Sequence, residues 1–217
     1  MKKVINSILL NTITPDAIYI NIPEFCKKEN KEYTIEDSIK NSEKVIINKC
    51  EDYGPITKLY PTLLKETDPE TVIICIDDDK EYDPKLIEHL LFASQKYPQN
   101  CICISGWNYI DINFFALPLV FSSINGVVKQ VDVLQCYNGV LYKRNFFQDD
   151  FIDYVNLKKC KSTDDIMISK YLDNKNIEIL SIPFDFKNKN INMNFFSSLG
   201  ITNLMNNNWI KCVKEKI

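Results

Sequence analysis

The sequence predicts a single α/β domain, in which helices and strands alternate along the chain. Apolar residues recur with helical spacing over residues 4–13 and again over residues 86–93. Continuous apolar runs at residues 71–76 and 101–105 are flanked by polar or glycine turns, a pattern typical of fully buried strands. No internal repeat or flexible linker interrupts the 217 residues, so one domain over residues 1–217 is expected.

The other elements follow from local signals. Gly54-Pro55 predicts a helix over residues 55–65, because proline is favoured at the first helical position, and Pro61 should kink or shorten it. Thr163 is a candidate N-cap for a helix that ends at Leu172. Residues 27–40 are polar and predict an irregular segment that ends in a short helix. Further strands are expected at residues 17–21, 45–47, 131–134, 139–142 and 177–182, and a terminal helix through Trp209.

Charge and hydropathy exclude two classes of partner. A net charge of -3 and a pI near 5.3 argue against binding to a nucleic-acid backbone, which requires a basic face. The most apolar stretch, residues 114–128, contains Ser122, Ser123 and Asn125 and is too short for a transmembrane helix of about 20 residues. Peripheral membrane contact is left open there, beside a buried or acceptor-covering segment.

The eight cysteines predict a reducing, cytoplasmic environment rather than a disulfide framework. Cys75, Cys101 and Cys103 lie within apolar strand-like runs, where cysteine acts as a small hydrophobe. A zinc site is not expected, because the chain has no C-x-x-C and only one histidine. No long apolar stretch typical of a signal peptide follows the first residues.

Three adjacent carboxylates, Asp77, Asp78 and Asp79, follow the apolar run at residues 71–76. Like charges so close together repel, and a divalent cation removes that cost. Oxygen ligands favour Mg²⁺ or Mn²⁺, with substrate phosphates completing the coordination shell. Ligands also gather at the carboxyl ends of α/β strands. The simpler alternative is a solvated turn before the helix that begins near Pro84.

The strand, the Asp-x-Asp pattern and the following helix resemble the metal-binding motif of GT-A fold glycosyltransferases. Residues 52–59, D-Y-G-P-I-T-K-L, are similar to the D-Y-G-P-x-x-K-L signature of a family-2-like group of these nucleotide-diphospho-sugar transferases. Residues 15–23, P-D-A-I-Y-I-N-I-P, also look like that group's second strand. The resemblance extends over residues 3–182.

The resemblance implies a Rossmann-type, mixed but mostly parallel sheet flanked by helices, with a nucleotide-binding half at residues 1–105 and an acceptor-side half at residues 106–217. It implies that Asp79 binds the metal, that Asp77 binds the metal or the ribose, and that Asp78 lies at the nucleotide. Asp52 and Lys58 would contact the base or ribose. Gly54 would let the backbone approach the nucleotide closely. Without the resemblance, a solvated helix lysine is an equally good interpretation of Lys58.

Residues 163–166, T-D-D-I, resemble the Glu-Asp pair that supplies the catalytic base in inverting members, and residues 138–144 resemble the family's acceptor-side strand. The resemblance assigns the base to Asp165, while Asp164 replaces the usual glutamate. The alternative is that both carboxylates only favour the helix dipole. Because Arg144 is the only arginine, the metal and lysines must neutralise most of the phosphate charge.

The expected activity is transfer of a sugar from a nucleotide-diphosphate donor, with UDP favoured, to a hydroxyl of a glycan or another acceptor, with Mn²⁺ or Mg²⁺. The family's first strand and its base-holding loop are expected to be missing, because no strand can form before Val4. This gap leaves open a nucleotide- or glycan-binding protein without turnover. A third alternative is a phosphohydrolase with Asp77 as nucleophile, although the segment at residues 52–59 has no role in it.

Two further side chains have open roles. Trp107 could stack on a sugar ring or pack in the core. His89 is expected to be a surface histidine or one with its hydrogen bonds satisfied.

Overall fold

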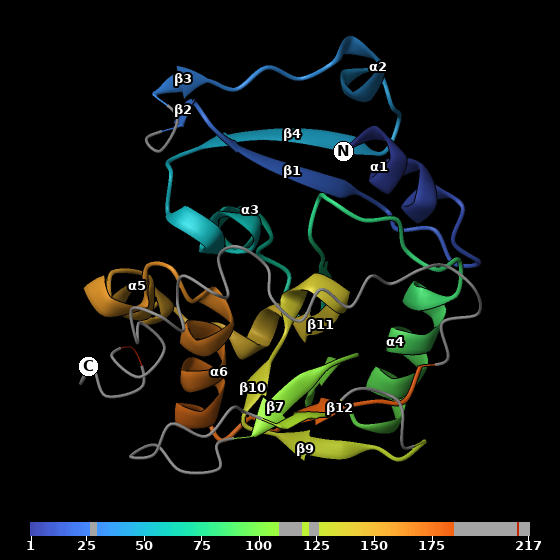
Figure 1. Ribbon diagram of the computed structural model, residues 1–217, viewed down its shortest axis with the longest axis vertical. Helices are drawn as coiled ribbons and strands as arrows, with labels where there is room; N and C mark the ends of the chain where they lie inside the picture. Colours follow the sequence, from blue (N-terminus) through green and yellow to red (C-terminus); the bar gives the residue numbers. More distant parts are fainter. Residues whose placement is uncertain (27–29, 109–118, 122–125, 185–211, 213–217) are drawn as a thin grey trace.

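A five-strand sheet lies at the centre of the protein (Figure 1). The computed structural model describes residues 1–26, 30–108, 119–121, 126–184 and 212. In spatial order, the sheet consists of β5 (Val72–Cys75), β11 (Val140–Lys143), β6 (Cys101–Cys103), β12 (Ile179–Ser181) and β9 (Lys129–Val131). The α/β class expected from the sequence is therefore confirmed.

The expectation of a mostly parallel sheet is wrong. β11 is antiparallel to both β5 and β6, and β9 is antiparallel to β12, so β6–β12 is the parallel pair of this sheet. The apolar pattern of a strand reports which of its faces is buried and carries no information about its direction. The direction of β11 depends on the long connection between β6 and β11, for which the sequence has only weak local signals.

Helices cover both faces of this sheet, as Figure 1 shows, with α4 (Leu86–Lys96) on one face and α6 (Asp164–Asn174) on the other. Alternation along β6 explains the layering. Cys101 and Cys103 belong to the core shared with α6, whereas Ile102 packs with the apolar side chains of α4. The short helix α5 (Phe151–Val155) packs against α6.

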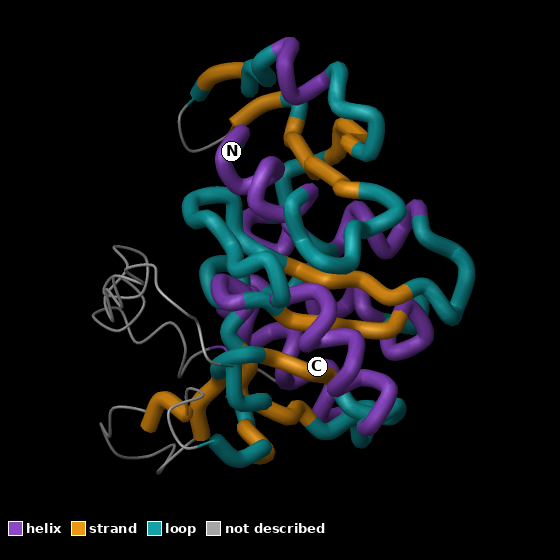
Figure 2. The backbone as a smooth tube through the Cα atoms, turned by 90° about the vertical axis from the view of Figure 1, so that its right-hand side faces the viewer, coloured by secondary structure: helices purple, strands orange, loops and turns teal. Residues whose placement is uncertain are grey.

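A second, two-strand sheet lies at one end of the molecule (Figures 1 and 2). Its strands, β1 (Ile18–Pro23) and β4 (Val45–Cys50), are parallel. The helices α1 (Lys2–Leu9) and α2 (Asp37–Lys40) contribute Ile5 and Ile39 to the apolar cluster on this sheet. A hairpin of β2 (Phe25–Cys26) and β3 (Lys31–Glu32) follows β1.

A third, antiparallel sheet has the order β10 (Val133–Leu134), β7 (Gly106–Asn108) and β8 (Leu119–Phe121). Gly106 is required here, because a Cβ atom would lie 2.6 Å from both the Val133 carbonyl and the Val131 side chain. Trp107 is partly buried and packs against the large core cluster, which favours the packing interpretation of this residue.

Two predicted elements differ from the structure. The helix expected over residues 55–65 is divided into a 3₁₀ helix, η1 (Gly54–Lys58), and α3 (Tyr60–Lys65), with the break at Leu59 before Pro61. β5, expected to be a buried central strand, is an edge strand whose Val72 is 39% exposed. Its apolar run correctly predicted a strand, but in the described structure a neighbour pairs with only one side.

Cys160 and Cys212 form a disulfide, so the expectation that no cysteines pair is wrong for these two. They are 52 residues apart, and sequence spacing carries no signal for such a pair. Cys75, Cys101 and Cys103 are buried free thiols, as expected. Cys160 ends the 3₁₀ helix η5 (Lys158–Cys160), which leads into α6.

Within the described residues, none of the helices has the length and apolar character needed to cross a membrane. Most of the apolar segment at residues 114–128, and the helix expected through Trp209, lie outside the described residues.

Candidate functional site

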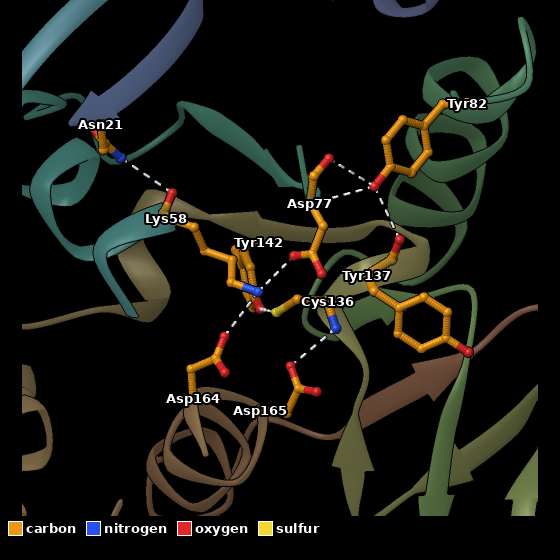
Figure 3. A network of polar contacts seen from close by, with 9 residues as sticks. All are labelled: Asn21, Lys58, Asp77, Tyr82, Cys136, Tyr137, Tyr142, Asp164 and Asp165. Carbon is orange, nitrogen blue, oxygen red and sulfur yellow. Dashed lines mark hydrogen bonds and ion pairs between the residues drawn. The ribbon is translucent and has the colours of Figure 1, made fainter. Parts of the chain in front are cut away.

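Three segments that are far apart in the sequence meet at the side chain of Lys58 (Figure 3). Its Nζ atom lies 2.7 Å from Asp77 Oδ1, just after β5, and 3.1 Å from Asp164 Oδ2, in the first turn of α6. Asp165 is the next residue of that turn. We call Lys58, Asp77, Asp164 and Asp165 the Lys58 cluster. The structure thus brings together four of the residues that the sequence singled out.

The position of Lys58 is fixed through its backbone by the small sheet. Asn21 of β1 donates hydrogen bonds to the Lys58 carbonyl, at 3.2 Å, and to Thr62 Oγ1, at 2.9 Å. The Asn21 side-chain oxygen accepts a hydrogen bond from Asn48 of β4, its partner in the strand register. The 3₁₀ helix that carries Lys58 is therefore tied to both strands of the small sheet.

The turn before η1 requires a glycine. Gly54 has φ of +74°, and a Cβ atom there would lie 3.0 Å from the Lys161 carbonyl, at the end of η5. Asp52 Oδ1 accepts a hydrogen bond from the Gly54 N–H at 2.9 Å. The segment at residues 52–58 thus packs closely against the chain that leads to Asp164.

The backbone of Asp77 is held by Tyr82. The Asp77 N–H donates to the Tyr82 hydroxyl at 2.9 Å, and that hydroxyl lies 3.0 Å from the Tyr137 carbonyl (Figure 3). Tyr82 is 6% exposed, and its N–H donates to Ser7 of α1. Asp77 is therefore anchored to η3 (Cys136–Asn138) at its backbone and to η1 at its side chain.

The side chain of Asp165 contacts the backbone of η3, whereas that of Asp164 pairs with Lys58. Asp165 Oδ1 accepts a hydrogen bond from the Cys136 N–H at 3.1 Å, and the Asp165 carbonyl accepts one from Ser169 within α6. The expected N-cap bond is absent at Thr163, whose hydroxyl donates to the Cys160 carbonyl instead. The helix thus begins without a side-chain cap, and both aspartates of its first turn lie at the site.

The electrostatic environment shifts the pKa values of Lys58 and Asp165 for different reasons. Burial alone would lower the pKa of Lys58, but the surrounding carboxylates, of which Asp164 contributes most, raise it well above its ordinary value. Burial and the negative charge of Asp164 raise the pKa of Asp165 to about 7, although Lys58 and Cys136 act in the opposite direction. Lys58 is therefore a fixed cation, and Asp165 can take up or release a proton near neutral pH.

A buried oxygen in the cluster has an incomplete set of partners. Asp164 is 8% exposed, and its Oδ2 makes no hydrogen bond of good geometry, although it lies within ion-pair distance of Lys58. The Cys136 thiol and the two carboxylates of Asp164 and Asp165 offer ligand atoms within 4.8 Å of one another. The neighbouring Cys75 thiol and burial raise the pKa of Cys136.

The aspartate triplet lies in a bend after β5, because that strand ends at Cys75. Strand alternation therefore does not decide which side each carboxylate faces. Asp78 and Asp79 are exposed, and among the described residues no hydrogen bond or ion pair engages their carboxylates. Carboxylate oxygens are the ligands that Mg²⁺ and Mn²⁺ prefer, but the ligand atoms that converge within 4.8 Å in the described part of the chain belong to Cys136, Asp164 and Asp165 and not to the triplet. Lys58 already neutralises part of the charge of Asp77.

An open hollow of about 430 Å³ lies where β1 and β4 end, next to the turn that begins η1. Its lining includes Asp52 and the exposed ring of Phe25. The full lining is Glu24, Phe25, Lys49, Cys50, Glu51 and Asp52. The last lining residue, Asp52, thus lies just before the 3₁₀ helix that carries Lys58.

Arg144 and His89 have structural partners away from the cluster. Arg144, in η4 (Arg144–Phe146), donates to the carbonyls of Leu63, Glu66 and Phe147. The His89 ring lies 2.7 Å from the Pro183 carbonyl, which confirms a histidine with a satisfied hydrogen bond. Neither side chain therefore contributes to the Lys58 cluster.

Several residues around the cluster had no role predicted from the sequence: Asn21, Lys80, Tyr82, Cys136 and Tyr137. Lys80 hydrogen-bonds Asn138 and lies over the rings of Tyr82 and Tyr137, at 5.2 and 4.5 Å from their centroids. Burial lowers the pKa of Lys80 to about 8, against the opposing effect of Asp77 and Asp79. The signal available in the sequence was the position of Lys80, directly after the triplet.

The chain matches no protein-family model, and no curated protein is significantly similar to it in sequence.

Proposed function

We propose that this protein is a metal-dependent, inverting glycosyltransferase of the family-2-like GT-A group, which transfers a sugar from a nucleotide-diphosphate donor to a hydroxyl acceptor. The observation that carries the proposal is the convergence on Lys58. The D-Y-G-P-I-T-K-L segment, the aspartate triplet and the Asp164-Asp165 pair resemble three separate motifs of that group, and they meet within ion-pair distance.

The donor would lie across the end of the small sheet and the Lys58 cluster. Asp52 and the hollow beside it offer a carboxylate and an exposed aromatic ring for the ribose and base, with UDP as the favoured nucleotide. Asp77 and Asp79 would hold Mn²⁺ or Mg²⁺, and Asp78 lies beside them in the same bend. When bound, the metal would neutralise charge on the donor's diphosphate. Lys58 adds a fixed positive charge there.

Asp165 would act as the base. Its carboxylate takes the proton of the acceptor hydroxyl while the hydroxyl oxygen forms a bond to the anomeric carbon. The bond from that carbon to the diphosphate oxygen breaks, and the diphosphate leaves with the electron pair. A pKa of about 7 suits this role, because the group is then a base of useful strength at neutral pH.

The test is sugar transfer from a panel of UDP-sugars to glycan and simple hydroxyl acceptors, with Mn²⁺. Asp165→Asn should lower the rate by about 10²-fold or more, the usual effect of removing a general base. Asp173→Asn, an exposed aspartate at the other end of α6, is the matched control and should leave the rate unchanged. Equal rates for wild type and Asp165→Asn would refute the role of Asp165.

A binding protein without turnover is the second candidate, and the two ion pairs of Lys58 favour it, because they offset part of the charge of Asp77 and Asp164 without any metal. Calorimetry that detects UDP binding, with no transfer to any acceptor, would select this candidate.

A cytoplasmic location is also part of the proposal, and the Cys160–Cys212 disulfide counts against it.

A further inference from the structure

Lys80 is a second cation at this site, on the side of Asp77 away from Lys58. Figure 3 shows Lys58 on one side of Asp77, and Tyr82 and Tyr137 on the other. The Lys80 ammonium lies over both of these tyrosine rings, 4.5 Å from the Tyr137 centroid and 5.2 Å from the Tyr82 centroid. Two lysine ammonium groups thus lie near Asp77, one from η1 and the other from the bend after β5 itself.

The ammonium of Lys80 is held firmly, because each of its neighbours is itself anchored. It donates a hydrogen bond to Asn138 Oδ1. Asn138 is 6% exposed and donates from its other end to Ser105 Oγ at 2.8 Å. The hydroxyl of Tyr82 bonds the backbone of Asp77, so the ring beneath the ammonium moves with the triplet. Few side-chain rotamers remain available to Lys80, which favours a binding role.

Lys80 is near the carboxylates of Asp77 and Asp79 but forms no direct ion pair with a described carboxylate. Among the described residues no carboxylate lies within ion-pair distance of Nζ, and its hydrogen-bond acceptor is a neutral amide. An ammonium group has three N–H donors, and the Asn138 bond uses one of them. Taking a cation partly out of water without an anionic partner is costly. An anionic ligand at this position would remove that cost.

We propose that Lys80 is a positioning residue that binds the diphosphate of the donor from the side opposite to Lys58. This inference rests on the proposed function for the identity of the donor. It adds a specificity element: two lysines on either side of the triplet select a ligand with two adjacent phosphates over one with a single phosphate or none. Asn138, Tyr82 and Tyr137 would hold the ammonium in place for that contact.

The experiment is calorimetry with inorganic pyrophosphate, UDP and uridine, each in the presence of Mn²⁺. Lys80→Met should weaken the binding of pyrophosphate and of UDP by about tenfold or more, as expected for a lost charge-assisted hydrogen bond. It should leave uridine binding unchanged. Lys80→Arg should recover most of the lost affinity. Lys85→Met, an exposed lysine just before α4, is the control and should bind all three ligands as the wild type does.

The outcomes separate this inference from the proposed function. Unchanged pyrophosphate and UDP affinity in Lys80→Met would overturn the role of Lys80 while leaving the glycosyltransferase proposal in place. Equal losses for UDP and uridine would also overturn it, because they indicate a structural defect. Binding of pyrophosphate that depends on Lys80, in a protein that binds neither UDP nor uridine, would support the anion site and refute the nucleotide donor.

Discussion

Lys58 connects the loop after β5 to the first turn of α6 through ion pairs of 2.7 and 3.1 Å. Its side chain is 24% exposed, and those of Asp77 and Asp164 are 30% and 11% exposed, so water screens these pairs only in part. The lysine therefore stabilises an arrangement in which three carboxylates lie close together. Removal of Lys58 leaves those carboxylates to repel one another.

Lys58→Met is expected to lower the free energy of unfolding by about 2 kcal/mol at neutral pH, because it leaves Asp77 and Asp164 partly buried without their cation. Urea denaturation measures the change. Combining it with Asp164→Asn should recover part of the loss, since one uncompensated charge is then removed. The control is Lys40→Met, which breaks the exposed Lys40–Asp37 pair and should leave stability close to that of the wild type, because solvent screens such a pair. A loss no larger than this control would contradict the electrostatic role of Lys58.

The carboxyl group of Asp165 should make stability depend on pH. Its pKa is about 7 in the folded protein and near 3.8 in an unfolded chain, so the folded state binds its proton more tightly. This contribution is fully present below pH 4 and is lost as the pH rises to about 7. Asp165→Asn, which cannot ionise, should therefore gain stability relative to wild type between pH 4 and pH 8.

The gain should exceed about 1 kcal/mol, since each unit of pKa difference corresponds to about 1.4 kcal/mol and relaxation reduces the full effect. Thermal denaturation of wild type, Asp165→Asn and the Asp173→Asn control across this pH range tests it. If the difference between wild type and Asp165→Asn is the same at pH 4 and pH 8, the raised pKa of Asp165 is wrong.

At the scale of elements, the 3₁₀ helix η1 positions Lys58, and the turn at Gly54 positions η1. Gly54 and Gly126 both have positive φ, of +74° and +62°, but only the first is crowded. The Lys161 carbonyl lies 3.0 Å from the position that a Cβ atom would take at Gly54, whereas no atom of the described residues lies within 4 Å of the equivalent position at Gly126. A comparison of alanine substitutions at the two glycines therefore distinguishes the cost of a left-handed backbone from the additional cost of a steric contact.

Gly126→Ala should destabilise the protein by about 1 kcal/mol, the cost of a left-handed conformation for a residue with a Cβ. Gly54→Ala should destabilise it by at least about 1 kcal/mol more, because the backbone carbonyl of Lys161 must also move. Urea denaturation of the two variants provides the comparison. Equal losses would indicate that η5 does not pack against the turn as described.

For the whole molecule, the sequence predicted most elements but not their arrangement. Apolar periodicity correctly located α1 and α4, each of which buries one face in the core, and apolar runs located β6 and β11, which are buried on both faces. The helix α6 was located from Thr163 as a candidate N-cap. The apolar pattern did not reveal that β11 is antiparallel to its neighbours or that β5 lies at an edge, because those facts depend on long connections. The Cys160–Cys212 disulfide was missed for the same reason.

The candidate site was predictable where residues belong to a motif. Lys58, Asp77 and the Asp164-Asp165 pair were singled out by resemblance, and the structure places them together. Lys80, Tyr82 and Tyr137 were not, because their proximity arises from the packing of η3 against the loop after β5. Asn138 was noted only as part of the segment that resembles an acceptor-side strand. Contacts between segments 58 residues apart leave no local trace in a single sequence.

The measurement that tests the central claim most directly is hydrolysis of UDP-sugars by wild type and Asp79→Ala, each with and without Mn²⁺. Asp79 is exposed, so its loss should leave the fold intact. We predict turnover only for the wild type with Mn²⁺, with a rate at least about tenfold above the other three conditions, because Asp79 would hold the metal. Equal turnover in all four conditions would contradict a metal role for the aspartate triplet.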